Sequence, residues 1–502
     1  MNKGKICVSI CAATADEFIE NIKRAAESAD VIELRFDCLP SDVIKSAIEN
    51  LPKIGKQYLV TFRPKEQGGK RDLTLGERLK FWEFLFWTKK ENAFWVDFEF
   101  DLSFVVNLEK TLTIASSHDF SGVSESSLIS YEVFAITNAD VLKIAVQTDD
   151  ITDSIAVWKL LERAKKDGKQ IILIAMGEAG KWTRILGLAH GAFMTYAALD
   201  AGKETAGGQI TAKDLIETYR VKELDEQTEI YGIVGNPISH SLSPFMHNAA
   251  FKAENRNAVF IPFEVKNLCE FIKKFVREKT REVELNFKGF SVTIPHKIEI
   301  INYLDSIDET AQVVGAVNTV KITDGKLQGF NTDAHGFVEP LKTVYGNLEN
   351  ISVAVFGSGG AARACIYALK KEKANVTIYA RNSEKAKSLA KEFDASFNDF
   401  NSRFSNLESF DVVVNATPLG MQGAFENETP IAASQMENVK LVYDLVYNPF
   451  ETALIKEARK ANVPTLGGLA MLVAQGAKQF EIWTGNLAPL KLMSAAALRK
   501  LK

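Results

Sequence analysis

The sequence predicts an α/β protein in three parts: an N-terminal (β/α)8 barrel, a smaller α/β domain, and a third domain that opens with a strand, a glycine-rich turn and a helix. Over the first ~220 residues, short apolar runs alternate with amphipathic stretches about eight times, close to the size of a typical barrel. The alternation starts again at "EIYGIVG" and a third time at "ISVAVFGSGGAARACIYAL". An open doubly wound sheet alternates in the same way and is the alternative for the first part.

Eight apolar runs supply the predicted strands of the first part, which we expect to form a barrel of the TIM type. They are "KICVSI", "DVIELRF", "QYLVTF", "FWVDFEF", "TLTIAS", "DVLKIAV", "QIILIAM" and "GAFMTYAAL". Helix-like stretches lie between them at 15–28, 75–92 and 151–167. Residues 221–228, "VKELDEQT", are mostly polar, so we expect a linker after a first domain of residues 1–220.

Composition and charge restrict the class of protein. Hydrophobic residues make up 46 % and charged residues 25 %, which is typical of a soluble globular chain. The net charge of −4 and pI near 6.0 argue against a nucleic-acid partner, and no apolar run approaches the ~20 residues of a membrane span. The five cysteines are few and scattered, so we expect a cytoplasmic, reduced protein without a metal or a disulfide framework; they are Cys7, Cys11, Cys38, Cys269 and Cys365.

Basic side chains gather at the predicted strand ends of the first part. Functional side chains of such barrels lie at the C-terminal ends of the strands. These ends supply Glu33, Arg35, Arg63, His118 and Lys143, and the later loops add Arg184 and Gln209. Three arginines, a histidine and a lysine at one mouth indicate a pocket for an anionic substrate, in particular a carboxylate.

Lys143 lies in the middle of the apolar run "DVLKIAV", where a lysine is unusual. Burial and neighbouring cations both disfavour an ammonium, so its pKa should fall toward neutrality. A neutral amine can form a Schiff base with a ketone, and His118 could then remove the acidified proton and protonate a leaving hydroxyl. The alternatives are a structural ion pair with a barrel carboxylate such as Glu33, or a lysine that points to solvent.

The strings "ELRFD", "TFRP…GG", "SSHDF", "LKIAV", "MG…G…R" and "GGQI" together resemble type I 3-dehydroquinate dehydratase over almost all of residues 1–220. The resemblance implies that Lys143 forms the Schiff base with 3-dehydroquinate and that His118 is the general acid and base. It implies that Arg184 holds the substrate carboxylate. The other substrate contacts that it implies are Glu33, Arg35, Arg63, Thr205 and Gln209.

One position departs from that family. Its members usually carry a glutamate directly before the two glycines, and this glutamate orients the histidine. Here Gln67 precedes Gly68, and Glu66 lies one place earlier. Either Glu66 takes the role through a local shift, or Gln67 orients His118 by hydrogen bonding alone. Because a neutral partner favours the imidazolium less, we predict a lower pKa for His118 than in relatives with the glutamate.

The string "VAVFGSGGAARA" predicts a dinucleotide site in the third part. Gly357, Gly359 and Ala362 fit G-x-G-x-x-A on a strand, turn and helix, where a pyrophosphate meets bare backbone and a helix N-terminus. The next strand ends in Arg381 instead of an acid, which favours the extra phosphate of NADP over the ribose of NAD; a solvated surface charge is the alternative. We therefore expect a Rossmann domain whose loop contacts also include Ser358, Gly360 and Ala361.

Polar clusters precede the glycine-rich turn. Ser241 and Ser243 carry hydroxyls suited to a polyol, and Thr293 and Lys297 follow a predicted strand. The string "GAVNT" supplies Asn318, and "GFNTDAHG" supplies Asp333. Reduction of a ketone needs a group that protonates the oxygen as hydride arrives, and Lys297 with Asp333 could supply it. A plain ion pair is the alternative for these two residues.

Together these strings resemble shikimate dehydrogenase over roughly residues 229–490. The resemblance implies Lys297 and Asp333 as the catalytic pair, NADP as the cofactor, and "NATPLGM" beside the nicotinamide, with Asn415, Thr417 and Met421. It implies that the C-terminal helix folds back, so that residues 229–330 with 470–502 form the substrate domain and 331–469 the NADP domain. The substrate contacts that it implies are Ser241, Ser243, Thr293, Asn318, Tyr447 and Gln475.

The two resemblances agree with each other, because the product of the first reaction, 3-dehydroshikimate, is the substrate of the second. The sequence therefore predicts a bifunctional enzyme that converts 3-dehydroquinate to shikimate through 3-dehydroshikimate. Two alternatives are open: a second half that acts on quinate, or a ligand sensor without turnover. A sensor should lose its nucleophile and its proton donor, whereas Lys143 and Lys297 are both present. The oligomeric state does not follow from the sequence.

Overall fold

The computed structural model describes residues 2–88, 94–102, 111–122, 131–133, 137–400 and 410–501. Contacts divide the chain into two compact units, residues 1–229 with 257–286, and residues 230–256 with 287–502. Over the described ranges, no helix is both long enough and apolar enough to span a bilayer.

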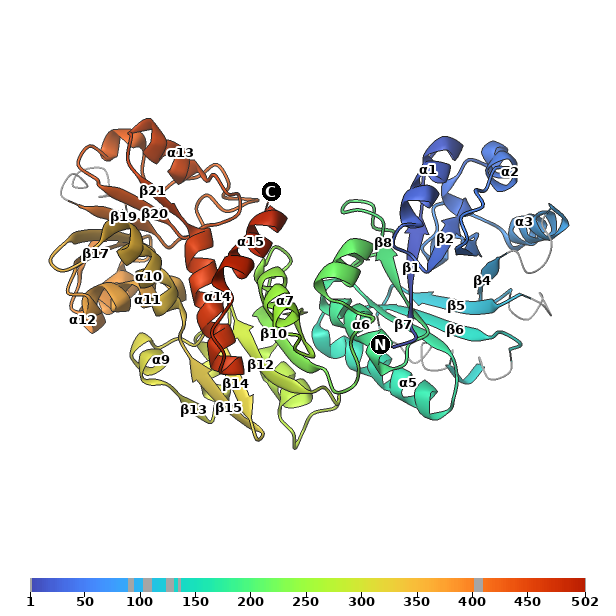
Figure 1. The fold of residues 1–502 in the computed structure, drawn as a ribbon, viewed down its shortest axis with the longest axis horizontal. Helices are drawn as coiled ribbons and strands as arrows, with labels where there is room; N and C mark the ends of the chain where they lie inside the picture. The colour runs from blue at the N-terminus through green and yellow to red at the C-terminus, as the bar shows by residue number, and fades with distance from the viewer. Residues whose placement is uncertain are drawn as a thin grey trace. The chain divides into compact units, whose positions relative to one another are not determined.

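Eight parallel strands form the barrel of the first unit (Figure 1). Each strand pairs with the next along the chain from β1 to β7, and β1 also pairs with β8, beside which lies the short β9. Phe193, directly before β8, donates its N–H to the Ile171 carbonyl at the start of β7 over 2.8 Å, which connects β7 to the start of β8. The strands are β1 (Lys5–Ile10), β2 (Val31–Arg35), β3 (Gln57–Thr61), β4 (Trp95–Glu99), β5 (Thr113–Asp119), β6 (Val141–Gln147), β7 (Ile171–Met176), β8 (Met194–Ala198) and β9 (Ile210–Thr211).

A shared interior supports a barrel over an open sheet. Buried side chains from seven of the eight strands form one cluster, which an open sheet would divide between two faces. They include Cys7, Val31, Leu59, Ile114, Val141, Ile172 and Tyr196. Helices of this unit bury one side each, as Phe18 and Ile22 of α1 show. The helices are α1 (Ala15–Ala25), α2 (Ser41–Glu49), α3 (Leu75–Thr88), α5 (Ser154–Lys166) and α6 (Lys181–Leu186).

The segment 221–228 is packed, although most of its residues are polar. Val221 and Leu224 are 0 % and 1 % exposed, and the Asn2 side chain donates to both of their carbonyls. The chain returns to this unit as β11 (Ala258–Glu264), α8 (Leu268–Phe271) and η7 (Ile272–Val276). Phe275 meets Trp182 of α6 edge to face, with ring centroids 5.6 Å apart.

A mixed sheet and a parallel sheet make up the second unit. Five strands of the mixed sheet lie in the order β10 (Glu229–Gly235), β12 (Phe287–Val292), β14 (Thr319–Thr323), β15 (Lys326–Phe330) and β13 (Ser306–Ile307). The parallel sheet has the order β18 (Ser396–Asp399), β17 (Asn375–Ala380), β16 (Ser352–Phe356), β19 (Val412–Asn415), β20 (Leu441–Asp444) and β21 (Thr465–Gly467). In chain order this is 3-2-1-4-5-6, the doubly wound arrangement of a Rossmann domain.

The helix α14 of this unit packs against the mixed sheet. Trp483 of α14 donates to the Val320 carbonyl over 2.9 Å, and Lys321 donates to the Ile482 carbonyl over 2.8 Å. A Cβ on Gly336 would lie only 2.5 Å from Cβ of Gln475, so a glycine is needed where α10 crosses α14. The helices are α7 (Ser243–Ala253), α9 (Glu309–Val314), α10 (Asp333–Tyr345), α11 (Gly360–Lys371), α12 (Ser383–Phe393), α13 (Ala453–Lys460), α14 (Gly468–Thr484) and α15 (Leu490–Leu501).

Candidate active sites

A cavity of about 100 Å³ lies at the C-terminal ends of the barrel strands. Parallel strands of a barrel end at one mouth, so side chains far apart in the sequence converge there. All eight residues predicted for this site line the cavity: Glu33, Arg35, Arg63, His118, Lys143, Arg184, Thr205 and Gln209. Gln67, one of the two candidates to orient His118, lines it too, and the structure adds Ser9 and Tyr196, which the sequence analysis did not assign to the site.

Lys143 is buried on β6, and its ammonium has both a carboxylate and an aromatic neighbour. Nζ donates to Oδ2 of Asp97 over 2.8 Å and lies 4.1 Å from the ring centroid of Tyr196. Burial and the Arg63 charge lower the pKa of Lys143, and Asp97 opposes them without reversing the direction. Lys143 thus forms an ion pair with a barrel carboxylate, but the partner is Asp97 instead of Glu33. The Glu33 carboxylate accepts hydrogen bonds from Ser9 and Thr61.

Asp97 of β4 connects the two cations at the bottom of the pocket. Its Oδ2 accepts from Arg63 over 2.7 Å as well as from Lys143. Burial by itself would raise the pKa of Asp97, but Arg63 and Lys143 outweigh it and hold that pKa at about 2. Asp97 and Glu99 alternate along the apolar run "FWVDFEF", so a search for charged residues in buried strands would have found them as it found Lys143.

His118 is held neutral in this arrangement. Its Nε2 lies 3.0 Å from Nη1 of Arg63, and a guanidinium can only donate, so the hydrogen-bond network assigns Nε2 as acceptor and Nδ1 as protonated. Burial and the charges of Arg63 and Lys143 lower the pKa of His118 well below its usual value. Among the residues that the structure describes, Nδ1 has no hydrogen-bond partner.

Of the two residues expected to orient His118, Gln67 is the one that contacts it. Its Oε1 accepts from the backbone N–H of His118 over 3.0 Å, and Gln67 lines the cavity, whereas Glu66 is exposed. The structure thus favours the neutral side chain of the two candidates. Its bond goes to the main chain of His118, so it fixes the position of the residue without touching the imidazole.

Arg184 presents an unpaired cation to the cavity. It is 2 % exposed, and only its Nη2 has a partner, the Gly207 carbonyl at 3.2 Å; within the described ranges Nε and Nη1 have none. Burial lowers its pKa to about 10. A buried guanidinium without a counter-charge is costly, so this pocket is suited to an anionic ligand. Thr205 and Gln209 hydrogen-bond to each other at the rim.

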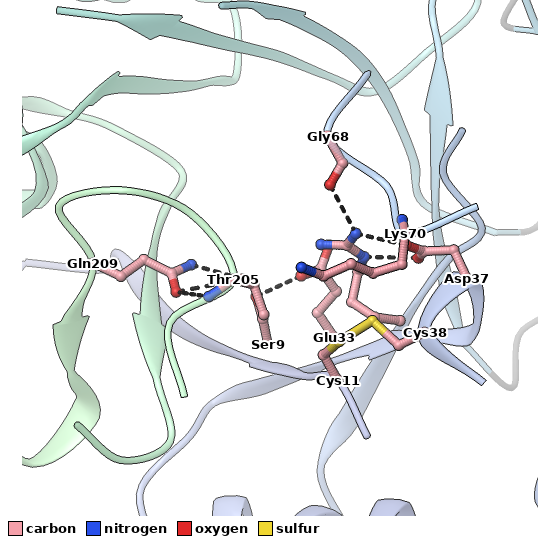
Figure 2. The surroundings of a disulfide bond; sticks show 10 residues. Ser9, Cys11, Glu33, Asp37, Cys38, Gly68, Lys70, Thr205 and Gln209 are labelled. Atoms are coloured by element: carbon pink, nitrogen blue, oxygen red, sulfur yellow. Dashed lines mark hydrogen bonds and ion pairs between the residues drawn. A yellow bond between two sulfur atoms is a disulfide. The ribbon is translucent and has the colours of Figure 1, made fainter. Parts of the chain in front are cut away.

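Two cysteines near this pocket form a disulfide, so the expectation that they are free thiols is wrong (Figure 2). Cys11 directly follows β1, and Cys38 lies in the turn after the neighbouring strand β2. Because the two strands pair in parallel, both residues reach the same edge, with Cα atoms 5.4 Å apart. The pairing depends on strand neighbours and therefore could not be deduced from a sequence separation of 27 residues.

A second cavity, of about 190 Å³, lies in the other unit. It is lined by all eight residues predicted for the second reaction: Ser241, Ser243, Thr293, Lys297, Asn318, Asp333, Tyr447 and Gln475. Nζ of Lys297 donates to Oδ2 of Asp333 over 2.5 Å. Asn318 donates to Oδ1 of the same carboxylate over 2.8 Å and to Oε1 of Gln475 over 3.3 Å.

Gln479 is a lining residue that the sequence analysis missed. Its Oε1 accepts from Ser291 over 2.9 Å, and both side chains border the cavity. Gln475 and Gln479 are one helical turn apart on the buried side of α14. Two glutamines at this spacing on a mostly apolar helix are the pattern that would have identified the second one.

The glycine-rich turn after β16 has the shape of a phosphate cradle. Gly357 has φ +124°, and a Cβ there would lie 2.8 Å from the Ala416 carbonyl, so a side chain is excluded. α11 begins at Gly360, and Ala362 is fully buried against the sheet. This bare backbone before a twelve-residue helix is suited to a dinucleotide.

The other predicted cofactor contacts have different surroundings. Arg381 is exposed directly after β17. Asn415 is buried and donates to Asp444 over 2.9 Å, while Thr417 donates to Asn415 over 2.6 Å, so these two shape the turn after β19. Burial raises the pKa of Asp444 to about 6. Met421 is 47 % exposed, and Ser358 and Ala361 are half-buried.

Comparisons with known proteins match families to both halves of the chain. Residues 6–226 match the family described as type I 3-dehydroquinase, and residues 233–320 match the substrate-binding domain of shikimate dehydrogenase. Residues 339–445 match shikimate/quinate 5-dehydrogenase, and 468–498 match the C-terminal domain of shikimate 5'-dehydrogenase.

Individual relatives extend these matches. The chloroplastic bifunctional 3-dehydroquinate dehydratase/shikimate dehydrogenase of Arabidopsis thaliana is 33 % identical over 523 residues, which cover 98 % of this chain and 84 % of the relative. The shikimate dehydrogenase (NADP⁺) of Methanocaldococcus jannaschii is 42 % identical and covers 55 % of this chain and 99 % of its own length. A crystal structure of a shikimate dehydrogenase in complex with NADP⁺ matches with a TM-score of 0.51 at 40 % identity, over 56 % of this chain and 98 % of that one.

Proposed function

This chain belongs to the family of bifunctional 3-dehydroquinate dehydratase/shikimate dehydrogenases, and we propose how its two pockets divide the work. The barrel pocket dehydrates 3-dehydroquinate to 3-dehydroshikimate through Lys143. The pocket of the second unit reduces 3-dehydroshikimate to shikimate with NADPH, at Lys297 and Asp333. The observation that carries the proposal is the buried Lys143, with a lowered pKa, in one cavity with His118 and with Arg184, whose Nε and Nη1 have no partner in the described part of the chain.

Dehydration begins when the amine of Lys143 adds to the substrate ketone and water leaves as the imine forms. The protonated imine withdraws electrons, so His118 can remove a proton from the adjacent carbon. The same histidine then returns this proton to the hydroxyl that leaves as water, and hydrolysis of the imine frees the product. Arg184 holds the substrate carboxylate, since its buried Nε and Nη1 have no partner among the residues that the structure describes.

Arg63 must release His118 before the proton transfer. Its Nη1 donates to the lone pair of Nε2, which is the site that would accept a proton. A substrate hydroxyl that accepts from Arg63 would draw the guanidinium away and free Nε2. Substrate binding would therefore activate the base, while Asp97 retains its bonds to Arg63 and Lys143.

Borohydride trapping tests this assignment directly. Treatment in the presence of 3-dehydroquinate should fix the ligand covalently on the peptide that contains Lys143, and mass spectrometry should locate it there. The variant Lys143→Ala should lose the adduct and the dehydration but retain NADP-dependent shikimate oxidation. Lys297→Ala should lose NADP-dependent shikimate oxidation but retain the adduct and the dehydration. An adduct elsewhere, or the loss of both activities in either variant, would disprove the separation of the two sites.

In the second pocket, Lys297 donates a proton to the carbonyl oxygen of 3-dehydroshikimate. Asp333 holds the ammonium at 2.5 Å, and Asn318 fixes the carboxylate from its other oxygen. NADPH supplies the hydride when it is bound. Ser241, Ser243 and Gln475 surround the cavity with groups that can hydrogen-bond to substrate hydroxyls.

The turn from Gly357 to Ala362 would hold the pyrophosphate of the cofactor, and Arg381 would meet the 2'-phosphate. A Cβ on Gly360 would lie 3.5 Å from Cδ of Lys297, so the turn lies next to the proton donor. Arg381→Ala should raise KM for NADPH about tenfold, because one charge-assisted phosphate contact is lost, and should leave KM for NADH unchanged. Equal effects on both nucleotides would contradict the role of Arg381.

Quinate is the second candidate substrate of this pocket, because residues 339–445 match a family described for shikimate and quinate alike. The two differ by a hydroxyl and a double bond, so kcat/KM for each with NADP⁺ separates them. We expect shikimate to be preferred, and a higher kcat/KM for quinate would reverse the assignment.

A further inference from the structure

The disulfide between Cys11 and Cys38 lies next to side chains of the dehydratase pocket (Figure 2). Cys11 is two residues after Ser9, whose hydroxyl donates to Glu33, and both Ser9 and Glu33 line the cavity. Cys38 directly follows Asp37 in the short turn η1 (Phe36–Cys38). The covalent bond therefore joins the ends of two neighbouring strands that supply pocket residues.

Asp37 is the main partner of a pocket cation. It is fully buried, and it accepts from Nε and Nη2 of Arg35 at 2.8 and 2.7 Å. Two parallel bonds of this kind fix both the position and the plane of a guanidinium. Asp37 also accepts from the backbone N–H of Lys70 at 3.1 Å, so it holds the loop that passes over the pocket.

The same loop reaches the base of the reaction. Arg35 donates to the Gly68 carbonyl over 3.2 Å, and the adjacent Gln67 accepts from the backbone of His118. A continuous series of contacts thus leads from Cys38 through Asp37 and Arg35 to this loop. A change in the position of η1 would alter the placement of Arg35 first and of the loop second.

We propose that Asp37 is a positioning residue for Arg35 and that the Cys11–Cys38 disulfide fixes the turn that carries it, so the affinity of the barrel pocket for its substrate depends on the thiol–disulfide state. This inference rests on the proposed dehydratase function of the pocket. Arg35 binds substrate in the disulfide form. In the dithiol form the turn is released, Arg35 is less well ordered, and substrate binds more weakly.

The exchange needs a partner of the dithiol or disulfide class. A dithiol reductant gives two electrons and two protons: the S–S bond breaks, both cysteines become thiols, and the reductant closes to its own disulfide. A small disulfide such as oxidised glutathione reverses the exchange and leaves as two thiols. Cys11 and Cys38 are both half-buried, so a small reagent can reach them, whereas Cys7 and Cys365 are buried.

The test compares the full chain after treatment with oxidised glutathione and after treatment with dithiothreitol. Reduction should raise KM for 3-dehydroquinate about three- to tenfold and change kcat less than about twofold, because Arg35 orients the substrate and does not transfer its protons. NADP-dependent shikimate oxidation in the same samples should be unchanged. Alkylation and mass spectrometry report which cysteines are free in each sample.

Three variants separate the disulfide from other thiols. Cys11→Ser should have the higher KM in both conditions, and Cys269→Ser, which removes an exposed free cysteine, should respond as the unaltered chain does. Asp37→Asn should show the higher KM while the disulfide is intact. Because reductant alone opens the bond in the unaltered chain, the test does not depend on a variant that folds poorly.

Several outcomes would overturn the proposal. One is an equal KM for 3-dehydroquinate in the disulfide and dithiol forms, once the thiol count confirms reduction. A second is alkylation of both Cys11 and Cys38 after treatment with oxidised glutathione, and a third is a loss of shikimate oxidation together with the change in dehydration. Absence of dehydration in either state would instead disprove the proposed function of the pocket.

Discussion

Replacement of Gln67 by glutamate should raise the pKa of His118. The carboxylate would take the place of an amide oxygen that lies 3.0 Å from the backbone nitrogen of His118. From there it would lie within about 6 Å of the imidazole ring, given standard covalent dimensions. A negative charge at that distance stabilises the imidazolium, whereas the amide in this chain does not.

The expected shift follows from Coulomb's law. Two unit charges about 6 Å apart interact by about 2.8 kcal/mol at an effective dielectric constant of ~20, which corresponds to about two pKa units. Desolvation of the new carboxylate reduces this, so we expect about one to two units. Burial and the charges of Arg63 and Lys143 already hold the pKa of His118 well below its usual value, and Gln67→Glu would bring it back toward that value.

The acid limb of kcat for dehydration reports this pKa, because the lysine is already an imine in the bound complex and His118 is the group that must be neutral. The limb should move to higher pH by one to two units in Gln67→Glu. Glu66→Gln is the matched control, since that side chain is exposed, and it should leave the limb where it is. An unmoved limb in Gln67→Glu, or an equal shift in the control, would refute this reasoning.

Four further predictions concern both units. Arg63→Met removes the cation that shares Asp97 with Lys143, so the pKa of Lys143 should rise. Borohydride trapping at neutral pH should then decrease several-fold, and it should decrease less in Arg63→Lys. Arg184→Ala should raise KM for 3-dehydroquinate at least about tenfold, as expected for a lost charge-assisted pair, and should still trap an adduct at saturating substrate. Gly357→Ala should abolish NADP-dependent shikimate oxidation and spare dehydration, because φ there is +124° and a Cβ would meet a carbonyl. Burial lowers the pKa of His247 to about 3, so below about pH 6.5 the unfolded chain binds a proton that the folded chain does not. The free energy of unfolding, measured in urea, should therefore decrease as the pH falls to 3, by up to about 1.4 kcal/mol per pH unit.

The parts of the fold that the sequence predicts are those set by local pattern. Eight apolar runs predict the barrel strands. A single strand followed by a glycine-rich turn and a helix predicts the nucleotide-binding domain. The division into compact units does not follow the chain order, because residues 257–286 belong with the barrel although 230–256, which precede them, belong to the second unit. Which helix packs on which surface depends on side chains such as Phe275 that meet only in three dimensions.

The predictable part of each site is the set of unusual residues at strand ends. Lys143 was identified because a lysine is out of place in an apolar strand, and the same argument applies to Asp97. What the sequence could not supply is pairing across the molecule. The disulfide requires that β1 and β2 be neighbours, and the contact of Gln67 with His118 joins a loop after β3 to the end of β5.

The two interpretations of Lys143, a structural ion pair and a nucleophile, do not exclude each other. A carboxylate at 2.8 Å would ordinarily keep a lysine protonated. Here the same oxygen of Asp97 accepts from Arg63 as well, at 2.7 Å, so one carboxylate is shared by two cations in a buried space. Burial and the charge of Arg63 then outweigh the attraction of Asp97, and the pKa of Lys143 is lowered although the ion pair is formed. The carboxylate thus holds the amine in place, and Arg63 is the charge that allows this amine to lose its proton.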